Sequence, residues 1–139
     1  MNNNNHVLHI VLDTNFLLIP FQFKLNFKTK FDELLDIKYE IVLLKEVYDE
    51  LLHIVKKARG KQKQGIQAAI QYFGEKEKIL ILEKRENEMV DDLLLRIATD
   101  NKYIIATNDK GLKRRLKNQG SNFIYLRQKS YFKSHRSFG

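Results

Sequence analysis

Four acidic residues carry the clearest chemical signal in this sequence: Asp13, Glu50, Asp91 and Asp109. Asp13 directly follows an apolar run that is typical of a buried strand, and Asp109 follows a second such run after a short polar segment. Asp91 begins a helical pattern and Glu50 lies within another. Ligands of open parallel α/β sheets bind at the carboxyl ends of the strands. We therefore expect these four acids to meet at one edge of a sheet.

A cluster of carboxylates without cysteine offers only hard oxygen ligands, which favour Mg²⁺ or Mn²⁺ over zinc. The sequence contains no Cys. Several anions alone would repel a phosphate group. One or two bound cations can instead bind the phosphate, activate a water molecule and stabilise the leaving oxygen. The acids therefore predict a Mg²⁺- or Mn²⁺-dependent site for phosphodiester chemistry.

Helical spacing separates these acids from their acidic neighbours. Apolar residues follow Asp91 at i+3, i+4 and i+7, so Asp91 borders the apolar face of its helix. Asp92 lies on a more polar face, where a salt bridge with Arg96 at i+4 is sufficient explanation. We therefore place Asp91 in the site and Asp92 in a supporting role. The same reasoning selects Glu50 over Asp49.

Each acid also has a purely structural interpretation, and other enzyme classes use similar patterns. An Asp after a strand is often a helix N-cap, and an acid in a first turn suits the helix dipole. A haloacid-dehalogenase-like phosphotransferase needs a second Asp two residues after the first, where this chain has Asn15. A phosphorelay receiver needs an Asp at the end of its third strand, where this chain has Glu83. No glycine-rich phosphate loop is present.

The elements that must position these acids alternate between strand and helix patterns, which indicates an α/β fold with a parallel sheet covered on both faces. The strand patterns are His6–Leu12, Tyr39–Leu44, Lys78–Leu82, Tyr103–Ala106 and Asn122–Leu126. The helical patterns are Asn15–Ile19, Phe27–Asp36, Lys45–Ala58, Gln62–Phe73, Glu88–Asn101 and Asp109–Asn118.

The chain length of 139 residues suits one domain over residues 1–139. We expect the Asn-rich residues 1–5 to be disordered and the basic residues 129–139 to form a flexible tail. No apolar run reaches the roughly 18 residues that cross a bilayer. The beginning of the chain lacks a signal-peptide pattern. We therefore expect a cytoplasmic protein.

Positive charge is concentrated in two segments. Residues 110–139 contain nine Lys or Arg and no acid, and residues 56–63 contain five more cations without an acid. Separated basic segments on a small domain favour nucleic acid as a partner; a solvated helix face is the alternative for residues 56–63. Residues expected to contact nucleic acid, including an aromatic ring that could stack on bases, are Lys56, Lys57, Arg59, Lys61, Lys63, Lys110, Lys113, Arg114, Arg115, Arg127, Lys129, Tyr131, Lys133 and Arg136.

The chain resembles PIN-domain nucleases. Four segments carry the resemblance, in the order and roughly the spacing of that family: Ile10-Val11-Leu12-Asp13-Thr14-Asn15, Val47-Tyr48-Asp49-Glu50-Leu51, Val90-Asp91-Asp92-Leu93-Leu94-Leu95-Arg96-Ile97-Ala98 and Ile105-Ala106-Thr107-Asn108-Asp109. Within the family, the chain is more similar to the archaeal and eukaryotic small-subunit rRNA-processing branch than to short VapC-type toxins. The basic segment after Asp109 and the basic end of the chain carry that similarity.

The resemblance implies a three-layer PIN-like α/β/α fold with about five parallel strands, and Mg²⁺- or Mn²⁺-dependent endonucleolytic cleavage of RNA. It implies that the metal ligands and catalytic residues are Asp13, Glu50, Asp91 and Asp109. It implies supporting roles for Thr14, Asn15, Asp92, Thr107 and Asn108. Lys45-Glu46 departs from the family, where small residues or proline are common.

Two other functions fit the same residues: a PIN module that binds RNA without cleaving it, and a VapC-type toxin ribonuclease of a toxin–antitoxin pair. Possible partners are RNA, a second copy of the chain, ribosome-assembly factors or an antitoxin. An assay of RNA cleavage separates an enzyme from a binding module.

Overall fold

The computed structural model describes residues 7–19, 25–75 and 78–137. Its centre is a six-stranded sheet with the order β3-β2-β1-β4-β5-β6. Neighbours among the first five strands in this order are parallel, and β6 is antiparallel to β5. The strands are β1 (Leu8–Leu12), β2 (Tyr39–Leu44), β3 (Ile79–Leu80), β4 (Tyr103–Ala106), β5 (Phe123–Arg127) and β6 (Tyr131–Ser134). The predicted α/β fold with a central parallel sheet is confirmed, with one antiparallel strand added.

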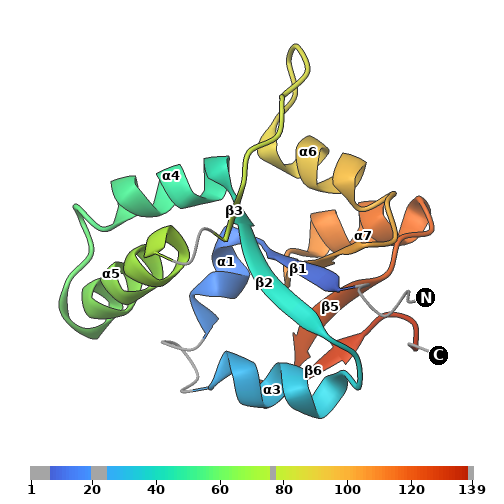
Figure 1. The fold of residues 1–139 in the computed structure, drawn as a ribbon, viewed down its shortest axis with the longest axis horizontal. Helices are drawn as coiled ribbons and strands as arrows, with labels where there is room; N and C mark the ends of the chain where they lie inside the picture. The colour runs from blue at the N-terminus through green and yellow to red at the C-terminus, as the bar shows by residue number, and fades with distance from the viewer. Residues whose placement is uncertain (1–6, 20–24, 76–77, 138–139) are drawn as a thin grey trace.

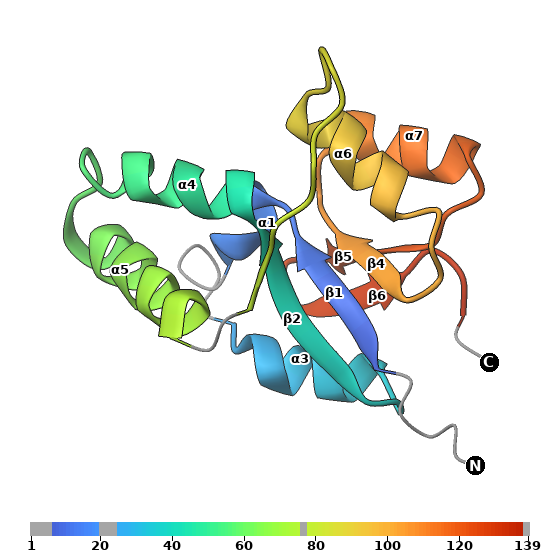
Figure 2. The ribbon, with the colours of Figure 1, turned by 45° about the horizontal axis from the view of Figure 1, so that its top comes forward.

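The helices lie on both faces of this sheet (Figures 1 and 2). They are α1 (Thr14–Leu17), α3 (Phe27–Leu34), α4 (Lys45–Ile54), α5 (Gly60–Glu75), α6 (Val90–Ile97) and α7 (Lys110–Asn118). Helices α6 and α7 cover β4 and β5, α3 lies on the opposite face, and α4 and α5 lie beside β2 and β3. In the part of the chain that the structure describes, no helix is long and apolar enough to cross a membrane.

The sheet core explains why these segments fold as strands. Ile10, Val11 and Leu12 of β1 are fully buried, as β-branched and apolar residues of a central strand covered on both faces should be. Neighbouring strands end level with one another, because Leu12 of β1 lies opposite Ala106 of β4. The residues that directly follow β1 and β4 are therefore brought side by side.

The chain order of the strands reverses between β1 and β4. From β1 the chain continues to β2 and β3 on one side, whereas β4, β5 and β6 lie on the other. In open α/β sheets, such a switch point leaves a crevice at the carboxyl ends of the two strands, where ligands bind. Asp13 follows one of these two strands and Thr107 follows the other.

The structure differs from the expected strands and helices in two places. The strand expected at Lys78–Leu82 is only Ile79–Leu80, because the exposed Ile81 lies beyond the pairing with β2. The basic segment 56–63 is divided between the turn after α4 and the first turn of α5, which begins at Gly60 with a φ of +61°. The expectation for residues 1–5 lies outside the described residues.

The tail expected to be flexible contains β6, and this expectation is corrected. Phe132 is 4% exposed and its ring lies 4.7 Å from that of Phe31 and 5.0 Å from that of Phe16, centroid to centroid. The flanking Tyr131 and Lys133 are exposed. Because this strand buries only one side chain between two exposed ones, its sequence lacks the repeated apolar residues that predict a strand.

Candidate active site

Asp13 lies at the centre of the switch-point edge. Its main-chain N–H donates to the carbonyl oxygen of Ala106 at 3.0 Å, which extends the pairing of β1 with β4, and the residue is 9% exposed. Burial raises the pKa of its carboxyl group; hydrogen bonds from Thr107 and Thr14 oppose this rise. The charges of two other acids, Asp91 and Asp109, raise the pKa further. These acids therefore act on one another electrostatically.

Thr107 connects two of these acids. Its hydroxyl donates to Oδ2 of Asp13 at 2.7 Å and accepts the main-chain N–H of Asp109 at 3.0 Å. Thr107 is fully buried; its bond to Asp13 is buried and its bond to Asp109 is partly buried, and a buried polar group without a partner is costly. One hydroxyl therefore fixes the carboxylate after β1 against the loop after β4.

Asp109 has both a structural and a candidate chemical role. Its Oδ1 accepts the main-chain N–H of Leu112 at 2.8 Å, so it is the N-cap of α7. Asn108 exchanges two hydrogen bonds with the main chain of Leu126 in β5, with distances of 3.3 and 2.7 Å. The loop that carries Asp109 is therefore held on both sides. The helix-cap interpretation is correct for Asp109, and the cap uses only one of its two carboxylate oxygens.

Glu50 reaches this edge from α4, which begins directly after β2. The hydroxyl of Thr14, the residue after Asp13, donates to its Oε1 at 2.6 Å. Glu50 itself is exposed. Asn15, expected to support the site, is exposed, and among the described residues its side chain makes no hydrogen bond. Glu50 is thus connected to the other acids through a single side chain.

The two neighbouring acids on α6 have different environments. Asp91 is partly buried; burial raises its pKa most and the charge of Asp109 adds to the rise. Asp92 instead accepts from Arg115 at 2.7 Å and from the main-chain N–H of Met89 at 3.0 Å, and both bonds lower its pKa. Asp92 therefore caps α6 and joins it to α7.

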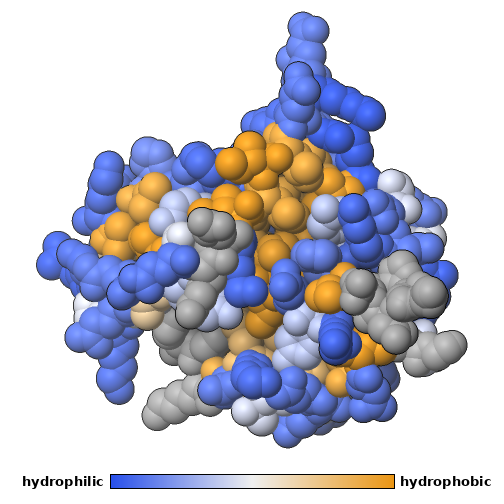
Figure 3. Space-filling model, in the orientation of Figure 1, coloured by the Kyte–Doolittle hydropathy of each residue, from blue (hydrophilic) through white to orange (hydrophobic). Residues whose placement is uncertain are grey.

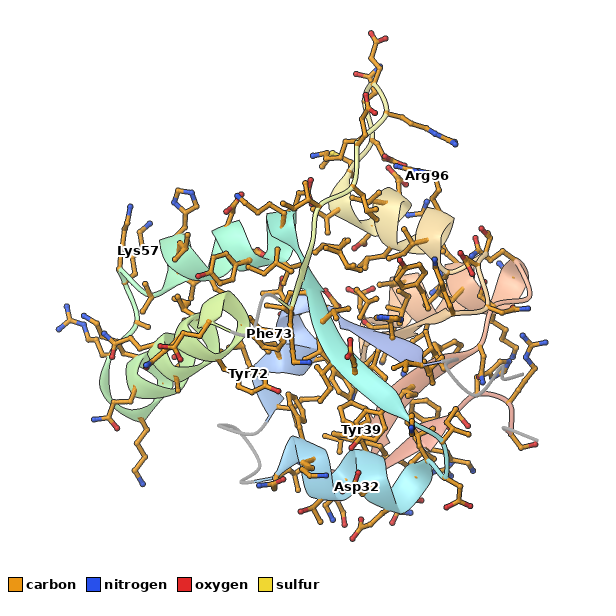
Figure 4. All side chains as sticks on the ribbon, in the orientation of Figure 1. Asp32, Tyr39, Lys57, Tyr72, Phe73 and Arg96 are labelled. Carbon is orange, nitrogen blue, oxygen red and sulfur yellow. The ribbon has the colours of Figure 1, made fainter. Side chains whose placement is uncertain are left out.

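The salt-bridge partner expected for Asp92 is wrong. Arg96 pairs with Glu88, through two N–O distances of 2.9 Å, and also donates to the main-chain oxygen of Glu83. It lies at the base of the loop that projects above α6 (Figure 4). The i+4 spacing identified a possible partner, but contacts between separate segments supplied better ones.

The donor set fits a hard divalent cation in its chemistry. All candidate ligands are carboxylate oxygens, and burial and repulsion between the acids raise the pKa values of Asp13 and Asp91, while the charge of Arg115 opposes the rise at Asp91. Within residues 7–19, 25–75 and 78–137, however, no three His, Cys, Asp or Glu side chains are grouped closely enough to hold a metal ion. The acids share an edge, and their side chains are not drawn together there.

Comparison with known proteins decides the family. The family model described as a PIN-like domain matches residues 10–129. The chain belongs to the PIN-like domain family. Ribonuclease VapC4 of Methanocaldococcus jannaschii is 36% identical over 126 residues, which are 88% of this chain and 93% of that protein. The predicted resemblance to PIN-domain nucleases is confirmed.

Solved PIN structures have the same fold. The PIN domain endonuclease Utp24 superposes with a TM-score of 0.71 at 22% identity, covering 96% of each chain. A chain of VapBC-1 from nontypeable Haemophilus influenzae superposes with a TM-score of 0.53 at 14% identity, covering 86% of this chain and 97% of that one.

The basic residues of this PIN domain lie at different distances from the acidic edge. Lys57 lies in the turn between α4 and α5, at the end of this helix pair away from the sheet (Figure 4). Lys110 directly follows Asp109 at the beginning of α7. Arg115 is paired with Asp92, and Arg136 donates to Gly120, so part of the charge of each is used within the protein.

Two features of the acidic edge carry no signal in the sequence. Gly111 lies where a Cβ atom would be 3.3 Å from Oδ1 of Asp109, so its lack of a side chain leaves room for that carboxylate. Figure 3 shows a hydrophobic surface in its upper centre. Ile81, directly after β3, and Met89, directly before α6, are 78% and 70% exposed. A comparison of related sequences would show whether position 111 is restricted to glycine, which a single sequence cannot show.

Proposed function

We propose that this PIN domain is a metal-dependent endoribonuclease that cleaves single-stranded RNA at the acidic edge. The observation that supports this most is the position of Asp13, Asp91 and Asp109 at the switch point of the sheet, where the charges of Asp91 and Asp109 raise the pKa of Asp13. Structural caps alone do not require acids from three separate segments to share this edge of the sheet. The name of the relative Ribonuclease VapC4 supports RNA as the substrate class.

In this proposal, Asp13, Glu50, Asp91 and Asp109 would hold Mg²⁺ or Mn²⁺. Bound metal would supply an activated water molecule and neutralise charge on the phosphate. Thr107 orients the Asp13 carboxylate and opposes the rise of its pKa by donating to Oδ2, and it fixes the main chain of Asp109. Such hydrogen bonds to the groups around a metal ligand typically affect metal affinity or activity by about 10–100-fold.

The test is cleavage of a 5′-labelled single-stranded RNA with Mg²⁺, Mn²⁺ or EDTA, with the Asp13→Asn variant as the control. We expect internal cuts with at least one metal, no cuts in EDTA and no cuts by the variant. Persistent cleavage by purified, folded Asp13→Asn protein would overturn the site. Binding without cleavage by the wild-type protein in both metals would identify a non-catalytic RNA-binding module instead.

Two RNA substrates deserve direct comparison. The resemblance of the basic segment after Asp109 to small-subunit rRNA-processing PIN nucleases favours precursor rRNA. The 36% identity to Ribonuclease VapC4 favours a toxin ribonuclease neutralised by an antitoxin. A ribosomal precursor transcript should be cut at discrete positions under the first proposal. Growth arrest on expression, relieved by a co-expressed neighbouring gene product and absent with Asp13→Asn, is expected only under the second.

A further inference from the structure

A second feature of the molecule lies on the flank of α7. Four cations, Lys110, Lys113, Arg114 and Lys117, have the spacing i, i+3, i+4 and i+7, so they share one face of this helix. The opposite face carries the buried residues Leu112 and Leu116. Seven residues of helix span about 10 Å, so the four cations form a stripe of that length beginning next to Asp109.

The stripe borders a cavity of about 410 Å³, within the range of small-molecule pockets. The other wall is aromatic and consists of Phe123, Tyr125 and His135. The rings of Phe123 and His135 are stacked, with 4.9 Å between centroids and an angle of 5° between planes. Because His135 is exposed and one of its faces covers Phe123, its other face is open to a ligand.

The charge of the stripe is not neutralised within the described residues. None of its four cations forms a salt bridge with an acid in residues 7–19, 25–75 and 78–137. Lys113 lies over the ring of Tyr125, 5.1 Å from its centroid, which keeps its charge at the cavity. The fifth cation of α7, Arg115, points the other way and is paired with Asp92. The uncompensated charge of this helix is therefore gathered on the side of the cavity.

We propose that this cavity, between α7 and the aromatic rings of β5 and residue 135, is a nucleotide subsite for single-stranded RNA next to the acidic edge. The cations contact phosphates, and one unpaired base stacks on the open face of His135. This combination of a basic track and exposed rings is how proteins hold single strands without reading a duplex. The proposal rests on the proposed function for its substrate, but its binding step needs neither metal nor cleavage.

The charge test measures binding of a labelled single-stranded RNA in EDTA, in the Asp13→Asn background. The pocket variant is Arg114→Gln with Lys117→Gln; the matched control, Lys38→Gln with Lys102→Gln, removes the same charge at the opposite end of the strands. We expect the pocket variant to reduce the slope of log affinity against log salt by about 1.4, because single strands release about 0.7 counterions per contact. Equal loss in both variants would overturn the subsite.

The stacking test compares intact RNA with RNAs that carry one abasic nucleotide at successive positions. With His135 present, we expect one position at which loss of the base weakens binding about 10-fold, as base–aromatic stacking predicts. In His135→Ala, intact and abasic RNAs should bind equally at that position. If His135→Ala retains the wild-type sensitivity to the abasic nucleotide, no base stacks there.

These outcomes separate the two proposals. If the wild-type protein cleaves RNA in none of the metals, but the charge test and the stacking test both give the expected result, the nuclease is rejected and the subsite is kept. Metal-dependent cleavage that Asp13→Asn abolishes, with no difference between pocket and control variants, would reject the subsite and keep the nuclease.

Discussion

The acidic edge has two sides that are held in different ways. On the side of β1 and β4, buried hydrogen bonds through Thr107 join Asp13 to the loop of Asp109, and that acid also caps α7. On the other side, Glu50 is exposed and bonded only to Thr14, and the Asp91 side chain makes no hydrogen bond within the described residues. The acids after β1 and β4 are held by hydrogen bonds to the loops and helix around them, whereas those on helices α4 and α6 have few or no such bonds and more room to adjust.

The strongest test of this comparison uses the adjacent acids of α6. Asp91→Asn should reduce RNA cleavage by about 10²–10³-fold or more, because it removes a charge that faces the other acids. Asp92→Asn removes an exposed ion pair and should change activity by no more than roughly threefold, with only a small loss of stability. Single-turnover cleavage measures the activity of each variant, and denaturant unfolding measures its stability. Equal activity losses would mean that α6 contributes through Asp92 as well.

The two threonines provide the second test. Thr107→Val keeps the side-chain shape but leaves a buried carboxylate and a main-chain N–H without their partner, so we expect a loss of about 1–3 kcal/mol in stability and about 10–100-fold in activity. Thr14→Val should cost under about 1 kcal/mol and about 10-fold or less in activity, because Glu50 remains hydrated. A larger effect at Thr14 than at Thr107 would reverse the proposed contrast.

The third test concerns the stability of the metal-free protein. The pKa of Asp13 is raised in the folded state, so the folded protein holds this proton more tightly than the unfolded chain does. The stability that this proton contributes is present at low pH and is lost as pH rises through the folded pKa. Asp13→Asn should therefore melt higher than the wild-type protein at neutral pH in EDTA, while losing cleavage.

Melting curves between pH 4 and pH 8 check this expectation, and the difference between the two proteins should shrink toward low pH. Adding Mn²⁺ should raise the melting temperature of the wild-type protein more than that of the variant. A variant that melts lower at every pH would show that the carboxylate stabilises the fold.

The smallest expected effect is at Gly111. Gly111→Ala should stabilise α7 by up to about 1 kcal/mol, because alanine favours helix. Its Cβ would lie 3.3 Å from Oδ1 of Asp109 and displace that carboxylate slightly, so activity should fall by less than about 10-fold. Thermal melting should show the gain in stability, and cleavage rates should show the loss in activity. Unchanged activity would mean that a small displacement of the Asp109 carboxylate does not affect cleavage.

The sequence predicts best what depends on neighbouring residues. The apolar run before Asp13 and the strand before Thr107 predicted two strand ends, and parallel topology then placed those ends together. Helical spacing distinguished Asp91 from Asp92. These features repeat with the period of one strand or one helix, so they are visible in a short segment of sequence.

Features that depend on distant segments were not predictable in this way. Arg96 pairs with Glu88 and Arg115 with Asp92 because the loop before α6 and the helix α7 pack there. The hydroxyl of Thr107 reaches Asp13 across 94 residues of sequence. β6 escaped detection because Phe132 alone of its central residues is buried, beneath a polar and basic exterior.

The antiparallel strand β6 also has a consequence for handling the protein. It covers the edge of β5 and places Phe132 against Phe16, Phe27 and Phe31. Deleting residues 129–139 to remove basic charge would therefore uncover an unpaired strand and a set of aromatic rings, both of which promote self-association. A truncated protein that binds RNA poorly would report aggregation as readily as lost contacts, so individual charge substitutions are the cleaner tool.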